Sequence, residues 1–211
     1  MTTTSTQQAT RNVITLKGSS EIVTEFLNYS INNILYQRGV YPAETFQTAK
    51  EYGIILYMST SQDLKDYLNC ILPQVQEWIA QGRVKEIVVV IKNATTLEAI
   101  ERWGFQIKSE AIIKPDEAAG PKKEGEKDLK EIQKEIREVM RQITASVSFL
   151  PLLDIACAFD IQVYTSSDCD TPCSWKEDSA YHIANPQEVQ LRCFSTSLHN
   201  VQASVVYKSG V

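Results

Sequence analysis

The chain has 211 residues, of which 43% are hydrophobic and 22% are charged, and its formal net charge is −5 at pH 7. This composition is ordinary for a globular domain, and the length suffices for a substantial hydrophobic core. The acidic balance argues against a function dominated by nucleic-acid phosphates, because that requires clustered Lys and Arg. The apolar runs, such as residues 87–91, are too short to span a membrane.

The N-terminal part of the chain predicts a polar tail, a strand and a helix. Residues 1–12 are rich in Thr, Ser and Gln and lack the basic start and apolar stretch of a signal peptide, so we expect a disordered tail. Residues 13–17 alternate in the manner of a strand. Ser20 is expected to cap a helix whose apolar residues recur every three or four positions, and Arg38 with Gly39 is expected to end it.

The middle of the chain alternates between strand and helix patterns. Strands are predicted over residues 53–59, 84–91 and about 103–107, because these runs are apolar or alternate. A helix is predicted to begin at Thr60. Pro73 is expected to kink or split that helix, because proline lacks an amide proton.

The second half of the chain predicts a loop, a long helix and three strands. Residues 115–127 are charged and contain Pro and Gly, which is typical of an exposed loop. A long amphipathic helix is predicted over about 128–147. Residues 154–165 carry the longest strand signal, and two alternating runs follow at 188–194 and 201–207. The whole pattern predicts an α+β fold with a mainly antiparallel sheet packed on three helices.

The sequence contains no evident catalytic apparatus. Cys169, Cys173 and His182 are metal-ligand residue types, but their spacing is not that of a zinc site, and a fourth ligand would be needed. Five cysteines without a secretory signal favour free thiols in the cytosol or nucleus. His199 is expected to be a surface or half-buried structural residue, and no glycine-rich phosphate loop occurs. We therefore expect no enzymatic activity and no metal or cofactor.

The end of the long helix carries the residue types of an interaction surface. Arg141 and Gln142 lie near that end, and Phe149 follows one to two turns later. Arginine and aromatic side chains dominate binding hot spots, so an exposed Phe149 would suit an interface. A buried Phe149 would instead belong to the core. After residue 165, strand-forming runs and a Pro-containing loop suit a mobile edge flap.

Three segments resemble the HORMA-domain proteins of the spindle checkpoint, and they read ILYQRGVYPAETF at 34–46, IERWGF at 100–105 and RQITASVSFLPLL at 141–153. The resemblance covers nearly the whole chain in the same order. It implies a single HORMA domain over residues 13–208. The chain departs from the family pattern at Pro73, in the Cys169 and Cys173 loop, and at its short C-terminus.

The resemblance also implies a mechanism. Residues 166–211 would form a safety belt that closes over a partner's extended peptide and holds it against the edge of the long strand. Closing would displace the first strand, which makes Ile14 and Leu16 the expected switch residues.

The same resemblance assigns roles to further residues. The peptide is expected to lie on Ile155, Cys157, Phe159, Ile161, Val163, Trp175 and Tyr207. An open subunit is expected to pair with a closed one through Gln37, Arg38, Arg141, Gln142 and Phe149.

The implied function is a conformational switch of the spindle assembly checkpoint. It would clasp a peptide of the anaphase-promoting-complex activator or of a coiled-coil kinetochore scaffold, inhibit the ubiquitin ligase and delay anaphase. An AAA+ remodelling ATPase with its HORMA adaptor is a further implied partner, whereas nucleic acid and membrane are not. Expected locations are the nucleus and cytoplasm, unattached kinetochores in mitosis, and the nuclear envelope. The alternatives are another HORMA adaptor, such as a polymerase accessory subunit or a meiotic axis protein, and a zinc-dependent enzyme.

Overall fold

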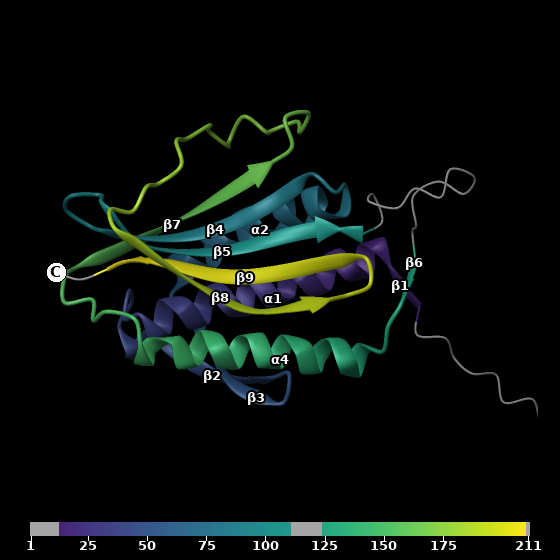
Figure 1. Cartoon of the computed structure of the whole chain (residues 1–211), viewed down its shortest axis with the longest axis horizontal. Helices are drawn as coiled ribbons and strands as arrows, with labels where there is room; N and C mark the ends of the chain where they lie inside the picture. The colour runs from purple at the N-terminus through teal and green to yellow at the C-terminus, as the bar shows by residue number, and fades with distance from the viewer. Residues whose placement is uncertain (1–12, 111–123, 210–211) are drawn as a thin grey trace, which may run out of the picture.

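The computed structural model describes residues 13–110 and 124–209, so the predicted tail over residues 1–12 lies outside the described residues. Its main sheet has five strands, which are β4 (Val84–Asn93), β5 (Ala99–Ser109), β7 (Cys157–Thr165), β8 (Pro186–Ser195) and β9 (His199–Lys208). They stand in the order β7-β4-β5-β9-β8, and each neighbouring pair is antiparallel. The two terminal strands of this sheet are therefore β7 and β8 (Figure 1).

Three helices and two small sheets complete the described fold. The helices are α1 (Leu16–Gln37), α2 (Gln62–Ala80) and α4 (Leu129–Ala145), with the short 3-10 turns η1 (Ala43–Thr45) and η2 (Ser146–Ser148). The small sheets pair β1 (Val13–Thr15) with β6 (Glu124–Glu126), and β2 (Phe46–Glu51) with β3 (Ile54–Ser59).

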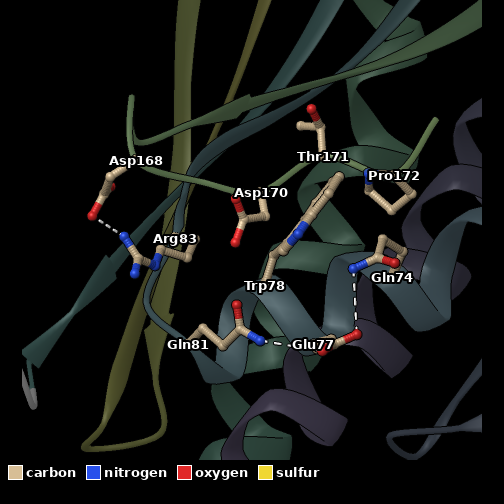
Figure 2. Close-up of a pocket in the computed structure, with 9 residues that line it drawn as sticks. All are labelled: Gln74, Glu77, Trp78, Gln81, Arg83, Asp168, Asp170, Thr171 and Pro172. Carbon is tan, nitrogen blue, oxygen red and sulfur yellow. Dashed lines mark hydrogen bonds and ion pairs between the residues drawn. The ribbon is translucent and has the colours of Figure 1, made fainter. Parts of the chain in front are cut away.

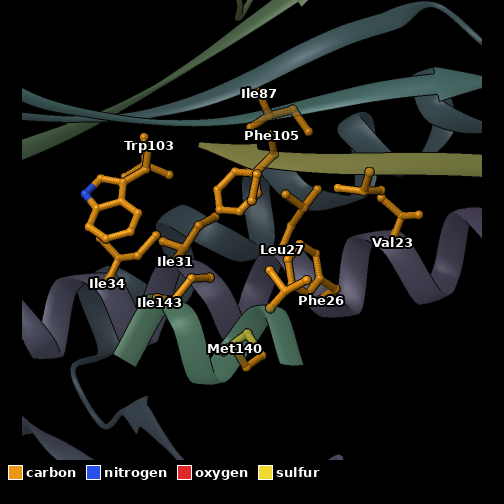
Figure 3. Packing of buried hydrophobic residues seen from close by; sticks show 14 of the residues in the cluster. Val23, Phe26, Leu27, Ile31, Ile34, Ile87, Trp103, Phe105, Met140 and Ile143 are labelled. Carbon is orange, nitrogen blue, oxygen red and sulfur yellow. The ribbon is translucent and has the colours of Figure 1, made fainter. Parts of the chain in front are cut away.

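The main core lies between the helices and one face of the five-stranded sheet. Phe26 of α1 meets Phe105 of β5 edge to face at 5.7 Å between ring centroids, and it meets Phe194 of β8 at 4.8 Å. Trp103 of β5 and Met140 of α4 are also buried in this layer (Figure 3). Because aromatic pairs of this geometry add to the gain from apolar burial, they hold α1 centrally beneath the sheet.

A second, smaller cluster covers the opposite face of the same sheet. Val88, Val90 and Ala99 are buried there, and Tyr181 and Ile183 pack against them. Since β4 alternates its side chains, Val88 and Val90 face away from the helices while Val89 faces the main core. The chain between β7 and β8 therefore crosses the outer face of the sheet.

The strongest periodic signals are confirmed by the structure. The predicted strands over 84–91 and 103–107 are β4 and β5, and the two terminal runs are β8 and β9. The long amphipathic helix is α4, and Arg38 with Gly39 ends α1 as expected, with Gly39 at a φ of 62°.

Several local predictions are wrong. Residues 13–17 are not one strand, because β1 ends at Thr15 and α1 begins at Leu16. Thr15, rather than Ser20, caps α1, and its hydroxyl accepts a hydrogen bond from the Gly18 amide at 3.1 Å. Ser20 lies inside the helix, where its hydroxyl donates to the Lys17 carbonyl.

Two further predictions need correction. Pro73 does not split α2, which runs unbroken from Gln62 to Ala80. Pro73 is exposed, and so is Asn69, so water can reach the Asn69 carbonyl that Pro73 leaves without an amide donor. In the predicted loop over 115–127, residues 124–126 form β6, while 115–123 lie outside the described residues. The strand β2 was not predicted at all.

Candidate functional site

The outer edge of β7 has no strand partner among the described residues, because β7 is terminal in the sheet. The Ala94 amide donates to the Ala156 carbonyl at 2.9 Å, which places the Asn93 and Cys157 pair at a non-hydrogen-bonded position of the β4 and β7 ladder. The Ile161 amide donates to the Asp160 carboxylate at 3.1 Å.

The backbone groups on this edge alternate along the strand. Successive residues of a strand direct their N–H and C=O groups to opposite edges. The backbone groups of Cys157, Phe159, Ile161 and Val163 therefore point away from β4. We call this row of backbone groups the free edge, and it can template an added strand.

The side chains of β7 form two rows. Those of Cys157, Phe159, Ile161 and Val163 pack on the helix side of the sheet. The Phe159 ring lies between Tyr41 and Tyr67, at centroid distances of 6.1 and 5.6 Å. At the free edge, the predicted peptide-binding residues of this strand therefore present mainly backbone groups to a partner.

Tyr67 of α2 is a residue of this site that sequence reasoning missed. Burial, followed by the charge of Asp160, raises the pKa of Tyr67 to about 12. Its hydroxyl lies within hydrogen-bonding distance of the Ile161 amide. No local pattern indicates this role, because Tyr67 occupies an ordinary position of an amphipathic helix.

Residues 166–185 connect β7 to β8, and we call them the crossing segment. Figure 1 shows this segment leaving the end of β7 and returning across the sheet to β8. At its start the Ser166 amide donates to the Arg83 carbonyl at 2.8 Å, and the Arg83 guanidinium pairs with Asp168. This pairing lowers the pKa of the Asp168 carboxyl to about 2.

Trp175, a predicted belt residue, packs edge to face on Trp78 of α2 at 4.8 Å. Beside this contact the crossing segment and α2 line an open polar pocket of about 400 Å³ (Figure 2). Gln74, Glu77 and Gln81 of α2 are bonded to one another along its floor. The start of the crossing segment is therefore fixed to α2.

Tyr207, which is among the predicted peptide-binding residues, lies away from the free edge. It is on β9, opposite Glu101 and Gln187, and its hydroxyl donates to Gln187 at 2.8 Å. Both β4 and β5 separate it from β7. Ile155, which precedes β7, is exposed.

In this structure the segment predicted to form a mobile flap is a hairpin of β8 and β9 that pairs with the main sheet. Phe194 and Val205 of this C-terminal hairpin are fully buried, and β9 is hydrogen-bonded along its length to β5. β1 lies outside the five-stranded sheet, in a two-stranded pair with β6.

The tip of the C-terminal hairpin is held by a buried polar network. His199 is only 1% exposed, so the expectation of a surface or half-buried histidine is wrong. Its Nδ1 lies 2.6 Å from the Ser19 hydroxyl, and its Nε2 lies 3.2 Å from the Ile79 carbonyl. The Ser19 hydroxyl also bonds Thr196 at 2.5 Å. The network ties the hairpin to α1 and α2, and the enclosed serine is shielded from solvent.

We expect this network to make stability depend on pH. Burial lowers the pKa of His199 below its ordinary value of 6.5, against an opposing bond to Ile79. Below about pH 6.5, His199 therefore binds a proton in the unfolded chain but not in the folded chain. The free energy of unfolding falls there by up to about 1.4 kcal/mol per pH unit. Urea melts from pH 7.5 to 5.5 should show a flatter slope for His199→Asn than for the exposed control His182→Asn. Equal slopes in both variants would contradict this expectation.

The predicted self-association residues separate into exposed and buried groups. Arg141 has a side chain 59% exposed and pairs with Glu138 at 3.0 Å, and Phe149 is 46% exposed. Leu152, three residues after Phe149, is 86% exposed. The half-buried Gln142 accepts a bond from the Arg192 amide of β8, which links α4 to the C-terminal hairpin.

Arg38 must be corrected, because it is not a surface residue here. Its guanidinium is 4% exposed and binds both oxygens of Glu101, at 2.9 and 3.0 Å, and the Pro151 carbonyl. Gln37 beside it is half-buried. Arg38 therefore positions the segment that bears Phe149 and Leu152 from beneath.

Within residues 13–110 and 124–209, no three His, Cys, Asp or Glu side chains gather as metal ligands would. Cys169 and Cys173 are free thiols, as are the other three cysteines. The zinc-dependent alternative thus gains no support from the described residues. None of the described helices combines the length and apolarity of a membrane span.

Comparison with known proteins matches this architecture to one family. A family model described as the HORMA domain matches residues 19–199. The mitotic spindle assembly checkpoint protein MAD2A of Dictyostelium discoideum is 47% identical over 95% of this chain and 96% of its own length. MAD2A of Homo sapiens is 47% identical over 92% of this chain and 93% of its own.

Solved structures of related proteins have the same fold as this chain. A chain in the crystal structure of a mitotic checkpoint complex superposes with a TM-score of 0.79 at 35% identity, covering 90% of this chain and 99% of that one. A structure of Caenorhabditis elegans HTP-2 bound to a HIM-3 closure motif has a TM-score of 0.72 at 15% identity, over 93% of both chains, and supports the fold alone. The chain therefore belongs to the HORMA domain family, and within it to the MAD2 group of mitotic spindle checkpoint proteins.

Proposed function

We propose that the chain is a conformational switch of the spindle assembly checkpoint that holds a partner's short peptide as an added strand on the free edge of β7. The observation that carries this proposal is the free edge itself, beside a crossing segment that is fixed at both ends. A peptide placed there would be bound through its backbone and enclosed by residues 166–185.

The described arrangement corresponds to the closed form of such a switch. β9 is paired with β5, and β1 has no place in the five-stranded sheet. Opening would require the β5 and β9 ladder, nine residue pairs long, to break. Breaking whole ladders makes the exchange slow and retention of the peptide long.

The relatives' names support the cellular role, since both are named as mitotic spindle assembly checkpoint proteins. The proposed partners are the anaphase-promoting-complex activator and a coiled-coil kinetochore scaffold, each offering a basic residue, several aliphatics and a nearby proline. Capture of the activator would inhibit the ubiquitin ligase and delay anaphase. The proposed sites of action are the nucleus, the cytoplasm and unattached kinetochores, with an AAA+ ATPase and its HORMA adaptor reopening the belt.

Backbone methylation of a probe peptide tests the added strand without altering the protein. The probe is a fluorescent synthetic peptide with a basic residue, an aliphatic run and a proline. Methylating an amide that faces β7 should weaken binding at least tenfold, whereas methylating its neighbour should have little effect, because only alternate amides enter a ladder. Equal effects at neighbouring positions would refute binding as a strand.

We also propose that the exposed surface of Arg141, Phe149 and Leu152 pairs two copies of the chain. An exposed guanidinium and large exposed apolar side chains within a short stretch of chain are the residue types of a binding hot spot. The buried Arg38 would support this surface through the Pro151 carbonyl.

Arg141→Glu should weaken self-association at least tenfold and leave probe binding unchanged, because truncated hot-spot arginines cost about 1–2 kcal/mol or more. Sedimentation velocity gives the association constant, and fluorescence anisotropy gives the probe affinity. Lys130→Glu, an exposed change of the same sign at the other end of α4, serves as the control. An undisturbed dimer in Arg141→Glu would remove this residue from the interface.

A further inference from the structure

Three polar side chains, one of them from the C-terminal part of the crossing segment, join this segment to the sheet. Lys92 of β4 donates from Nζ to Asp160 Oδ2 of β7 at 3.0 Å and to the Tyr181 hydroxyl at 3.1 Å. The Tyr181 hydroxyl donates to the same Asp160 oxygen at 3.3 Å. The Lys92 side chain is 15% exposed, so water screens its ion pair less than it would on an open surface.

Apolar contacts surround this triangle. The Tyr181 ring and Ile183 cover Val88 and Val90, and the Lys92 ammonium lies 5.3 Å from the Tyr181 ring centroid. That geometry adds a cation–π attraction to the hydrogen bonds. Nearby, the Gln162 amide donates to the Ser179 carbonyl at 2.9 Å. The contacts hold residues 179–183 onto the outer face of β4 and β7.

We propose that Lys92, Asp160 and Tyr181 form a latch that fastens the crossing segment across the sheet and sets how slowly a bound peptide is released. This inference rests on the proposed function, because it assumes a peptide on the free edge of β7. Such a peptide leaves sideways only after the crossing segment lifts, and lifting breaks the latch. Lys92 and Tyr181 are therefore positioning residues that act through the segment.

Asp160 links the latch to the free edge. One carboxylate oxygen accepts from Lys92 and Tyr181, while the other accepts from the Ile161 amide, which faces the edge. An added strand would accept the hydrogen bond of the Ile161 amide, so that Asp160 would bond only to Lys92 and Tyr181. The two variants that test the latch cleanly are therefore at Tyr181 and Lys92, away from that amide.

The fastening is tested first without any peptide. Lys176 is the only Lys or Arg in residues 166–185, so limited trypsin cleavage after it reports lifting of the segment. Tyr181→Phe keeps the ring and removes only the hydroxyl, and Lys92→Met keeps the aliphatic stem. Each should speed cleavage about fivefold to tenfold, as expected for loss of a charge-assisted hydrogen bond. Tyr52→Phe, which removes a tyrosine–carboxylate hydrogen bond to Glu25 between the β2–β3 turn and α1, is the matched control and should not change the rate.

The role in retention is tested by the dissociation rate of the fluorescent probe peptide. Tyr181→Phe and Lys92→Met should raise this rate by the same factor as cleavage, with the association rate undiminished, and Lys92→Arg should restore most of the retention. The double variant, with both Tyr181→Phe and Lys92→Met, should release the probe no faster than the single variant with the higher dissociation rate, because the latch opens as a unit.

Two results would overturn the inference. Unchanged cleavage in both variants would show that the three residues do not fasten the segment. Faster cleavage with unchanged probe dissociation would show that the segment does not gate release. Failure of the wild-type chain to bind the probe would overturn the proposed function and the retention role with it, while the cleavage rates would still decide the fastening.

Discussion

Replacing Glu101 with Gln should lower the free energy of unfolding by about 3–5 kcal/mol, the usual cost of breaking a buried ion pair by removing one partner. Glu101 is 1% exposed and accepts three bonds from Arg38 and one from the Trp103 indole at 3.2 Å. Without the carboxylate, the Arg38 guanidinium stays buried with its charge unbalanced. Urea denaturation measures the loss.

Glu98→Gln is the matched control for this prediction. Glu98 lies just before β5 and pairs with Lys208 at 2.8 Å, but the two side chains are 52% and 34% exposed. Exposed pairs contribute about 0–1 kcal/mol, so this change should be nearly silent. Similar losses of unfolding free energy in the two variants would mean that burial does not make the Arg38–Glu101 pair more important for stability than an exposed pair.

Truncating Leu16 to Ala should shift the population toward the described arrangement by roughly thirtyfold to more than a hundredfold. Leu16 is half-buried in the first turn of α1 here, so its truncation should cost this form little. In the other form, β1 would enter the main sheet and bury Leu16, and losing a buried leucine costs about 2–3 kcal/mol or more. Such a difference between two forms converts directly into their ratio.

Ion-exchange chromatography and NMR of the peptide-free chain measure this population. Leu129→Ala is the control, because Leu129, like Leu16, is the first residue of a helix, and its side chain is exposed. It should leave the distribution as in wild type. If Leu16→Ala also keeps that distribution after long equilibration, β1 is not the displaced element of the switch.

The elements that sequence predicted well are those whose own residues carry the signal. Residues 84–91 are a continuous apolar run, and the apolar residues of α4 recur with helical spacing, so β4 and α4 followed from local pattern. β2 was missed because it forms a two-stranded sheet with β3 and mixes half-buried with exposed residues, which leaves no clear alternation. The start of α1 was misplaced because the alternation over residues 13–17 favours a strand and Ser20 is a common capping residue type.

The interactions that sequence did not predict join residues far apart in the chain. Arg38 was assigned to a surface because its partner Glu101 is 63 positions away. His199 was assigned an ordinary role because Ser19 is 180 positions away. Tyr181 carries no pattern at all until the fold brings it onto Lys92. The predicted peptide-binding residues do lie on the terminal strand β7. Only the register with β4 shows which backbone groups of that strand point away from the sheet.

Residue-resolved amide hydrogen exchange of β7, with and without the probe peptide, tests the central claim most directly. The amides of Phe159, Ile161 and Val163 should become strongly protected on binding, because they face the free edge. Those of Asp160 and Gln162 should change little, because the ladder with β4 already holds them. Binding of the probe without new protection of the first three amides would contradict the account.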